Sequence, residues 1–153
     1  MTFHEPTRVP SQRSTASEVT AALPLAVVGE GATVTVPAVL RYHARDPYAV
    51  HLDIHTGEPE PITWFFARDL LREGLGRPAG VGDVTVRPSG GAERPGDLFL
   101  TLTGPHSAAL LRARACEVAY FLGRSEELVA PGSEHERLDL DGLVDHLLGR
   151  AAD

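Results

Sequence analysis

Residues 46–57 read DPYAVHLDIHTG and carry a regular alternation of polar and apolar side chains. Valine, leucine and isoleucine take one parity of this stretch, whereas His51, Asp53 and His55 take the other. Alternate residues of a β-strand point to opposite faces of a sheet, so the pattern predicts a strand with one buried and one solvated face. Asp46-Pro47 marks a turn directly before it.

The polar triplet His51, Asp53 and His55 allows two interpretations. Histidine and carboxylate side chains at alternating strand positions can share one metal ion, as a metal-dependent enzyme would require. The same alternation is what any half-buried strand needs, and the sequence offers no identifiable fourth ligand. We therefore favour a solvated strand face and keep the metal-dependent enzyme as an alternative.

The residues around this strand predict more strands and a few helices. Strand patterns cover 18–29, 32–42, 48–55, 62–67, 82–88 and 96–104, with Pro24 and Pro37 expected at edges or bulges. Helical patterns cover 68–75, the stretch from Pro105 to about 123, and 138–150. We expect an α+β fold with an antiparallel, partly barrel-like sheet of six or seven strands and two or three helices.

The composition suits one globular domain and limits the partners. The chain has 153 residues, which we divide into a flexible N-terminal tail over 1–16 and a single domain over 17–150. Fourteen basic residues, all arginine, face 21 acidic ones, and the net charge of −7 argues against a phosphate backbone or an anionic membrane as partner. We expect a cytoplasmic protein without a secretory signal, in which Cys116 is a buried small residue.

The stretch TWFFARDLL, residues 63–71, places three aromatic residues side by side. On a strand, Trp64, Phe65 and Phe66 must point to both faces, so one face belongs to the core and the other needs a covering helix, subunit or partner. Arg68 and Asp69 follow at the expected corner between strand and helix, where a local ion pair or a helix cap is the simplest interpretation.

No catalytic motif is recognisable in the chain. A G-x-S-x-G nucleophile elbow, a Walker lysine and a G-x-G-x-x-G fingerprint before a long helix are all missing from the sequence. We therefore expect no enzyme, no cofactor and no metal.

Several blocks of the chain are similar, in order and spacing, to the signature region of the SsgA-like proteins. These blocks are LRY followed by DPYAV, H-x-x-x-HTG, W-x-FARDLL-x-EGL, RP-x-G-x-GDV-x-V-x-P, and APGSEHERLDLDGLVDHLL towards the C-terminus. The resemblance covers about residues 17–150. The chain departs from the family in an N-terminal tail that is longer than usual, and Asp53 falls where the family has no fixed acid.

The resemblance implies a function that the residues alone do not. SsgA-like proteins are non-enzymatic adaptors of sporulating actinomycetes that place septa, in part through the division protein FtsZ, or direct spore-wall peptidoglycan remodelling. It implies a homotrimer with a fold like that of the Whirly proteins, which bind single-stranded nucleic acid, and a place at division septa reached through protein partners. Single-stranded nucleic-acid binding is thus a further alternative. The family motif falls here on Pro47, His51, His55, Ala67 and Leu70, and on the candidates for a partner or subunit interface, which are Tyr42, Asp46, Tyr48, Trp64, Phe66, Arg68 and Asp69.

Overall fold

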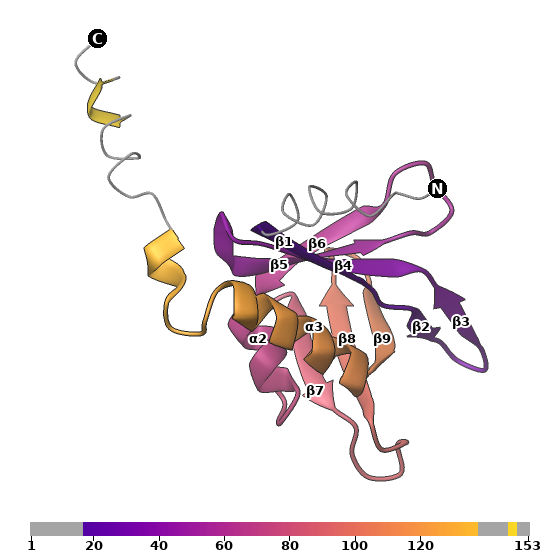
Figure 1. Ribbon diagram of the computed structural model, residues 1–153. Helices are drawn as coiled ribbons and strands as arrows, with labels where there is room; N and C mark the ends of the chain where they lie inside the picture. Colours follow the sequence, from indigo (N-terminus) through magenta and orange to yellow (C-terminus); the bar gives the residue numbers. More distant parts are fainter. Residues whose placement is uncertain (1–16, 138–146, 150–153) are drawn as a thin grey trace, which may run out of the picture.

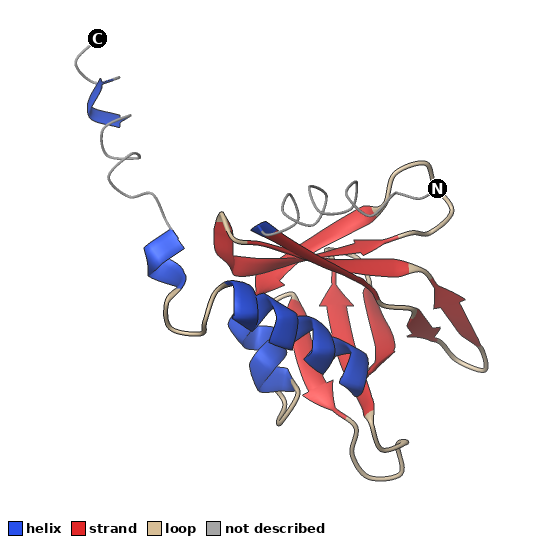
Figure 2. Ribbon diagram, in the orientation of Figure 1, coloured by secondary structure: helices blue, strands red, loops and turns tan. Residues whose placement is uncertain are grey.

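The computed structural model describes residues 17–137 and 147–149, and they form an α+β fold with two antiparallel sheets (Figures 1 and 2). Sheet A has the strand order β1-β4-β5-β6, and sheet B has the order β3-β2-β9-β8-β7. The strands are β1 (Glu18–Ala22), β2 (Leu25–Val28), β3 (Thr33–Val36), β4 (Ala38–His43), β5 (Asp46–Ile54), β6 (Ile62–Ala67), β7 (Val84–Pro88), β8 (Asp97–Thr103) and β9 (Ala108–Arg114). The helices are α2 (Arg68–Gly74), α3 (Ala115–Leu128) and the 3₁₀ helix η2 (Glu134–Arg137).

The two N-terminal strand patterns each divide at a proline. Pro24 separates β1 from β2, and Pro37 separates β3 from β4, because proline has no N–H for the ladder. The chain therefore leaves sheet A after β1, forms the β2–β3 hairpin in sheet B and returns to sheet A as β4. Among the described residues nine strands form where six or seven were predicted, and they make two sheets that do not close into a barrel.

The predicted helix from Pro105 to 123 is wrong in its first half. Residues 108–114 form strand β9, which pairs with β2 and β8, and the helix begins only at Ala115. From Leu111 to Arg114 the chain alternates as a strand does, with Leu111 and Ala113 buried and Arg112 and Arg114 on the other face. With the helix start moved, Cys116 lies on the exposed side of α3 and not in the core as expected.

One hydrophobic core joins both sheets to the helices. It contains Leu40 and Leu52 from sheet A, Leu100 from sheet B, and Val118 and Phe121 from α3. The two helices lie along one side of the sheets, where α3 contacts β1 and β9 while α2 contacts β5 and β7 (Figures 1 and 2). Of the predicted helix over 138–150, only residues 147–149 are described, and they are helical with exposed leucines.

Arg68, at the start of α2, is fully buried and ties the helices together. Its guanidinium group donates to the backbone oxygens of Ser125 and Val129 at 3.1 and 2.8 Å, and to the Glu134 carboxylate at 2.8 Å. It also lies 4.7 Å from the centre of the Tyr42 ring in β4. The hydrogen bond from Arg68 lowers the pKa of the Glu134 carboxyl, against the opposing effect of burial.

We predict that Gly74→Ala destabilises the protein. A Cβ at this buried position of α2 would lie 2.5 Å from the Cβ of Val86 in β7, so the helix or the strand must move. We expect a loss of about 1–3 kcal/mol in the free energy of unfolding, measured by urea denaturation. Gly123→Ala, in α3 with open space around it, is the control and should be neutral or stabilising by up to about 1 kcal/mol.

We predict that Glu134→Gln destabilises the protein in a pH-dependent way. At pH 7 the variant leaves the buried Arg68 charge without its carboxylate, a change that costs about 3–5 kcal/mol in other buried pairs. Because the folded-state pKa of Glu134 is lowered, its contribution is complete above the ordinary glutamate pKa of about 4.3 and is lost as the pH falls through the folded-state value.

The difference in unfolding free energy between wild type and Glu134→Gln should therefore shrink between pH 7 and pH 3. Glu127→Gln, at an exposed position near the end of α3, is the control and should change the free energy of unfolding little at either pH. An equal difference at both pH values would contradict the assigned role of the carboxylate.

Candidate functional site

The two motifs that carry the candidate residues meet at one end of sheet A. The turn at Asp46-Pro47 opens β5, and β6 lies beside β5 and leads directly into α2. Tyr42, in the neighbouring strand β4, donates a hydrogen bond from its hydroxyl to the Pro47 backbone oxygen at 2.9 Å. This bond fixes the turn from below, since the Tyr42 side chain is buried.

The seven candidates separate into buried and accessible side chains. Tyr42, Phe66 and Arg68 are buried and support the corner between β6 and α2 from inside. Asp46, Tyr48 and Asp69 are exposed, and Trp64 is half-buried at the edge of the core. Only the accessible side chains, Asp46, Tyr48, Asp69 and part of Trp64, can therefore contact a partner directly in the predicted interface.

The three adjacent aromatics point to two faces, as the strand geometry requires. Phe66 points into the core, and Trp64 points to the same side nearer the edge. Phe65 points outward, is 59% exposed, and stacks on His51 of β5 with ring centres 4.5 Å apart. Phe65 thus presents an apolar ring on the solvated face of sheet A, supported by an imidazole.

Paired charges lie beside Phe65 on the outer face of sheet A. Arg41 donates from Nε to Asp53 at 2.6 Å, and Thr63 donates to the same carboxylate at 2.6 Å. The hydrogen bond from Arg41 lowers the pKa of Asp53 most, and Thr63 adds to the effect. His51 faces Asp46, with 3.7 Å between Nε2 and the carboxylate oxygen.

With these contacts, the polar triplet His51, Asp53 and His55 gives no support to the metal alternative. Asp53 is already held by Arg41 and Thr63, while the imidazole of His51 stacks on Phe65. His55 lies beyond the end of β5 and is exposed. Among residues 17–137 and 147–149, no group of three or more histidine, cysteine, aspartate or glutamate side chains is placed to hold a metal ion.

Arg68 and Asp69 do not pair with each other, although a local ion pair was one of the two simple interpretations of this corner. Asp69 pairs with Arg72 one turn later in α2, and Arg72 also donates to Glu126 of α3 at 2.7 Å. The pairing of Arg68 with Glu134 could not be found from local spacing, because 66 positions separate the two residues. The only indication in the sequence was that Glu134 lies in the family block that begins with APGSE.

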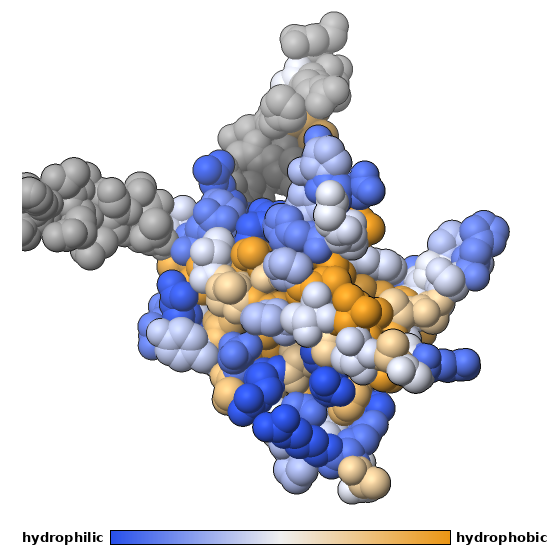
Figure 3. Space-filling view, turned by 90° about the vertical axis from the view of Figure 1, so that its right-hand side faces the viewer, coloured by the Kyte–Doolittle hydropathy of each residue, from blue (hydrophilic) through white to orange (hydrophobic). Residues whose placement is uncertain are grey.

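An apolar groove opens between the two sheets, away from the corner, and sequence reasoning missed it. It has a volume of about 260 Å³ and is lined by both sheets, with Ile62 and Trp64 from β6 opposite Val27, Leu102 and Leu111. Figure 3 looks at the side of the molecule where β2, β3 and β9 lie in Figure 1, and apolar side chains gather in the middle of that face. Ile62 is 53% exposed there.

Around the two motifs in the described part of the chain, Asp53 is paired with Arg41 and Asp69 with Arg72, and none of these four side chains lines the apolar groove. None of the helices among the described residues is long and apolar enough to span a membrane.

Comparison with known proteins gives a consistent result. Residues 36–134 match the model of the family described as "Streptomyces sporulation and cell division protein, SsgA". The chain is 46% identical over 125 residues to the sporulation-specific cell division protein SsgB of Streptomyces coelicolor, which covers 82% of this chain and 90% of that protein. The SsgB protein of Salinispora tropica is 42% identical over 139 residues, covering 89% of this chain and 95% of that protein.

Two solved structures resemble the fold closely. The structure of SsgB from Streptomyces coelicolor superposes with a TM-score of 0.74 at 45% identity and covers 80% of this chain and 96% of that one. The SsgA-like sporulation-specific cell division protein of Thermobifida fusca superposes with a TM-score of 0.75 at 36% identity, covering 85% of this chain and 95% of that one. The chain therefore belongs to the SsgA family of sporulation and cell division proteins.

Proposed function

We propose that this chain is a non-enzymatic adaptor of sporulation-specific cell division that binds FtsZ, or another division or cell-wall protein, as a homotrimer in the cytoplasm at division septa. The observation that carries the proposal is the 46% identity to a sporulation-specific cell division protein over 90% of that protein's length. The geometry is compatible with this role, because the family blocks form a surface on which polar and charged side chains contact one another.

The partner-binding surface that we propose lies on the outer face and the end of sheet A. Tyr48 and Phe65 are 48% and 59% exposed, and aromatic side chains of this kind often anchor protein interfaces. His51 of β5 stacks on Phe65, and Asp46, which opens the same strand, lies 3.7 Å from Nε2 of His51 and adds a carboxylate to this surface. This combination of exposed aromatic rings and a polar rim is typical of a protein interface.

The apolar groove is where we place the contact between copies of the chain. Exposed apolar surface on a soluble protein often marks an interface, and this groove is lined mostly by apolar side chains from both sheets. The half-exposed Ile62 and the neighbouring Trp64 give a second copy apolar surface on which to pack. The trimeric assembly implied by the family resemblance would provide this cover.

We predict that the purified chain co-sediments with FtsZ of the same organism when GTP drives its polymerisation. The double variant Tyr48→Ala, Phe65→Ala should weaken binding about tenfold or more, since interface aromatics commonly contribute more than 1.4 kcal/mol. Tyr120→Ala removes an aromatic ring that is 69% exposed on α3 and serves as the control, with binding unchanged. Failure of the wild-type chain to pellet with FtsZ polymers would exclude FtsZ as the direct partner.

We predict that Ile62→Glu converts a trimer to a monomer in size-exclusion chromatography with light scattering. A carboxylate in the apolar groove would be desolvated in the assembly, whereas the half-exposed position tolerates it in the separate chain. Val81→Glu, on a fully exposed loop position, is the control and should leave the mass unchanged. A monomeric wild type, or a trimeric Ile62→Glu variant, would show that the groove is not the subunit contact.

A further inference from the structure

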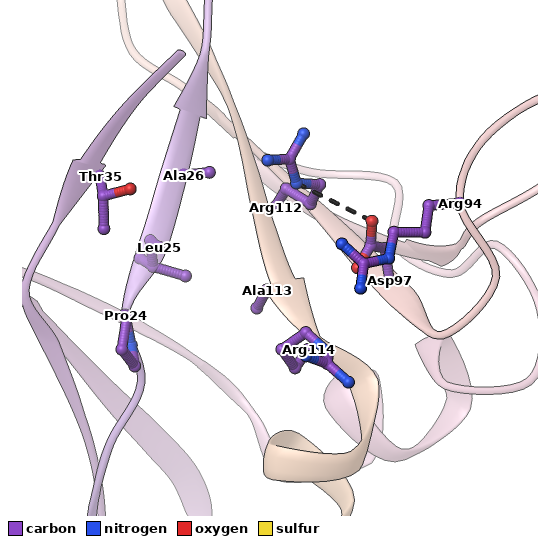
Figure 4. A pocket seen from close by; sticks show the side chains of 9 residues that line it. All are labelled: Pro24, Leu25, Ala26, Thr35, Arg94, Asp97, Arg112, Ala113 and Arg114. Atoms are coloured by element: carbon purple, nitrogen blue, oxygen red, sulfur yellow. Dashed lines mark ion pairs between the residues drawn. The ribbon is translucent and has the colours of Figure 1, made fainter.

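A second, smaller pocket lies on sheet B, remote in sequence from the family motif at 46–57. It has a volume of about 180 Å³ and lies between the ends of β2 and β9 and the loop that joins β7 to β8. Three arginines line it, Arg94, Arg112 and Arg114, together with Asp97 and four small or apolar side chains and Thr35 (Figure 4).

Strand register explains why arginines gather here. Arg112 of β9 lies opposite Phe99 of β8, and Phe99 in turn lies opposite Arg87 of β7, so two arginines flank one ring on the outer face of sheet B. Arg114 lies opposite Asp97 in the neighbouring row of the same ladder. Arg94 belongs to the β7–β8 loop, and in Figure 4 its side chain reaches back across Asp97 towards β9.

The carboxylates near these arginines satisfy only part of the positive charge. Glu93 binds Arg87 through two hydrogen bonds of 2.7 and 2.9 Å and thereby neutralises it. Asp97 has a side chain that is only 6% exposed and lies 3.8 Å from Nε of Arg112. Within the described ranges of the chain, Arg94 and Arg114 have no carboxylate partner.

The charge sum of this patch is opposite to that of the chain. Four arginines (Arg87, Arg94, Arg112 and Arg114) against Glu93 and Asp97 give 4 − 2 = +2, whereas the whole chain carries −7. Folding has thus concentrated uncompensated guanidinium groups around one hollow of an acidic protein. Guanidinium groups bind carboxylates in a planar, two-point geometry, and such charge-assisted hydrogen bonds are about twice as strong as neutral ones.

We propose that this hollow, which we call the arginine pocket, binds a glutamate- or aspartate-rich segment of a partner protein. Arg94 and Arg114 hold the carboxylates, and Asp97 orients Arg112 from below. The proposal refines the proposed adaptor role, and it depends on that role for the statement that the partner is a protein. Because the outer face of sheet B is separate from Tyr48 and Phe65 on sheet A, the acidic segment binds beside the interface proposed there and does not replace it.

The structure favours an acidic peptide over nucleic acid. Binding of single strands depends on exposed aromatic faces on which bases stack, and on a basic groove along several phosphates. Phe99, the aromatic side chain in the outer row of sheet B, is 6% exposed beneath Arg87, whose guanidinium carbon lies 4.4 Å from the ring centre. The pocket is a compact hollow of about 180 Å³, which suits one or two carboxylate groups better than a run of phosphates.

The test is a fluorescence anisotropy titration of the full chain with a fluorescein-labelled glutamate-rich decapeptide at low ionic strength. We expect saturable binding that weakens as salt is added, because the contact is electrostatic and partly exposed. The double variant Arg94→Glu, Arg114→Glu should weaken binding about tenfold or more, which corresponds to about 1.4 kcal/mol or more.

The matched control is the double variant Arg45→Glu, Arg77→Glu. It changes the net charge by the same amount at two exposed arginines outside the arginine pocket, and its affinity should stay within about twofold of wild type. The proposal is overturned if the wild-type chain does not bind the peptide, if both double variants lose affinity equally, or if a labelled oligothymidylate of equal charge binds more tightly at the same site. Since the probe is not a division protein, this result is independent of the sedimentation with FtsZ.

Discussion

The buried guanidinium group of Arg68 is the constraint on which the arrangement of the helices depends. A charge removed from water is costly unless hydrogen bonds and a counter-charge replace the lost hydration. Here two backbone oxygens at the end of α3 and the Glu134 carboxylate provide that replacement, and all of them come from the last third of the described chain. The buried side chain at the start of α2 therefore depends on the end of α3 and on η2 for its hydrogen bonds.

The same constraint explains why several side chains of the family block at residues 63–71 are buried, although the block was predicted to form an interface. Phe66 and Arg68 point inward, where Arg68 lies against the Tyr42 ring, and Tyr42 holds the turn at Pro47. The exposed members of the motifs are thus displayed on a corner that buried hydrogen bonds make rigid. A rigid display lowers the ordering cost of binding, which suits an adaptor whose affinity comes from a few anchors.

The sequence predicted what depends on local pattern and missed what depends on distant pairing. The alternation around His51 correctly gave a half-buried strand, and TWFFA correctly gave a strand whose aromatics point to two faces. The helix expected over ALLRAR was wrong, because Leu111 fits the apolar face of a helix with Ala115 and equally fits a strand with Ala113, and pairing with β2 and β8 decided the outcome. The ion pair of Arg68, the groove between the sheets and the arginine pocket all join residues that only the fold brings together.

An acidic chain gains from keeping its free guanidinium groups in one place. Long-range repulsion by a net charge of −7 suppresses contacts with other acidic proteins and with nucleic acid over most of the surface. The local excess of +2 around the hollow acts at short range, where carboxylates can approach Arg94 and Arg114. Selectivity then follows from geometry, because a partner must present acidic side chains on a segment narrow enough to enter the hollow. Sheet A offers the opposite chemistry, with paired charges around exposed rings, so the two outer faces can recognise different features of one assembly without competing.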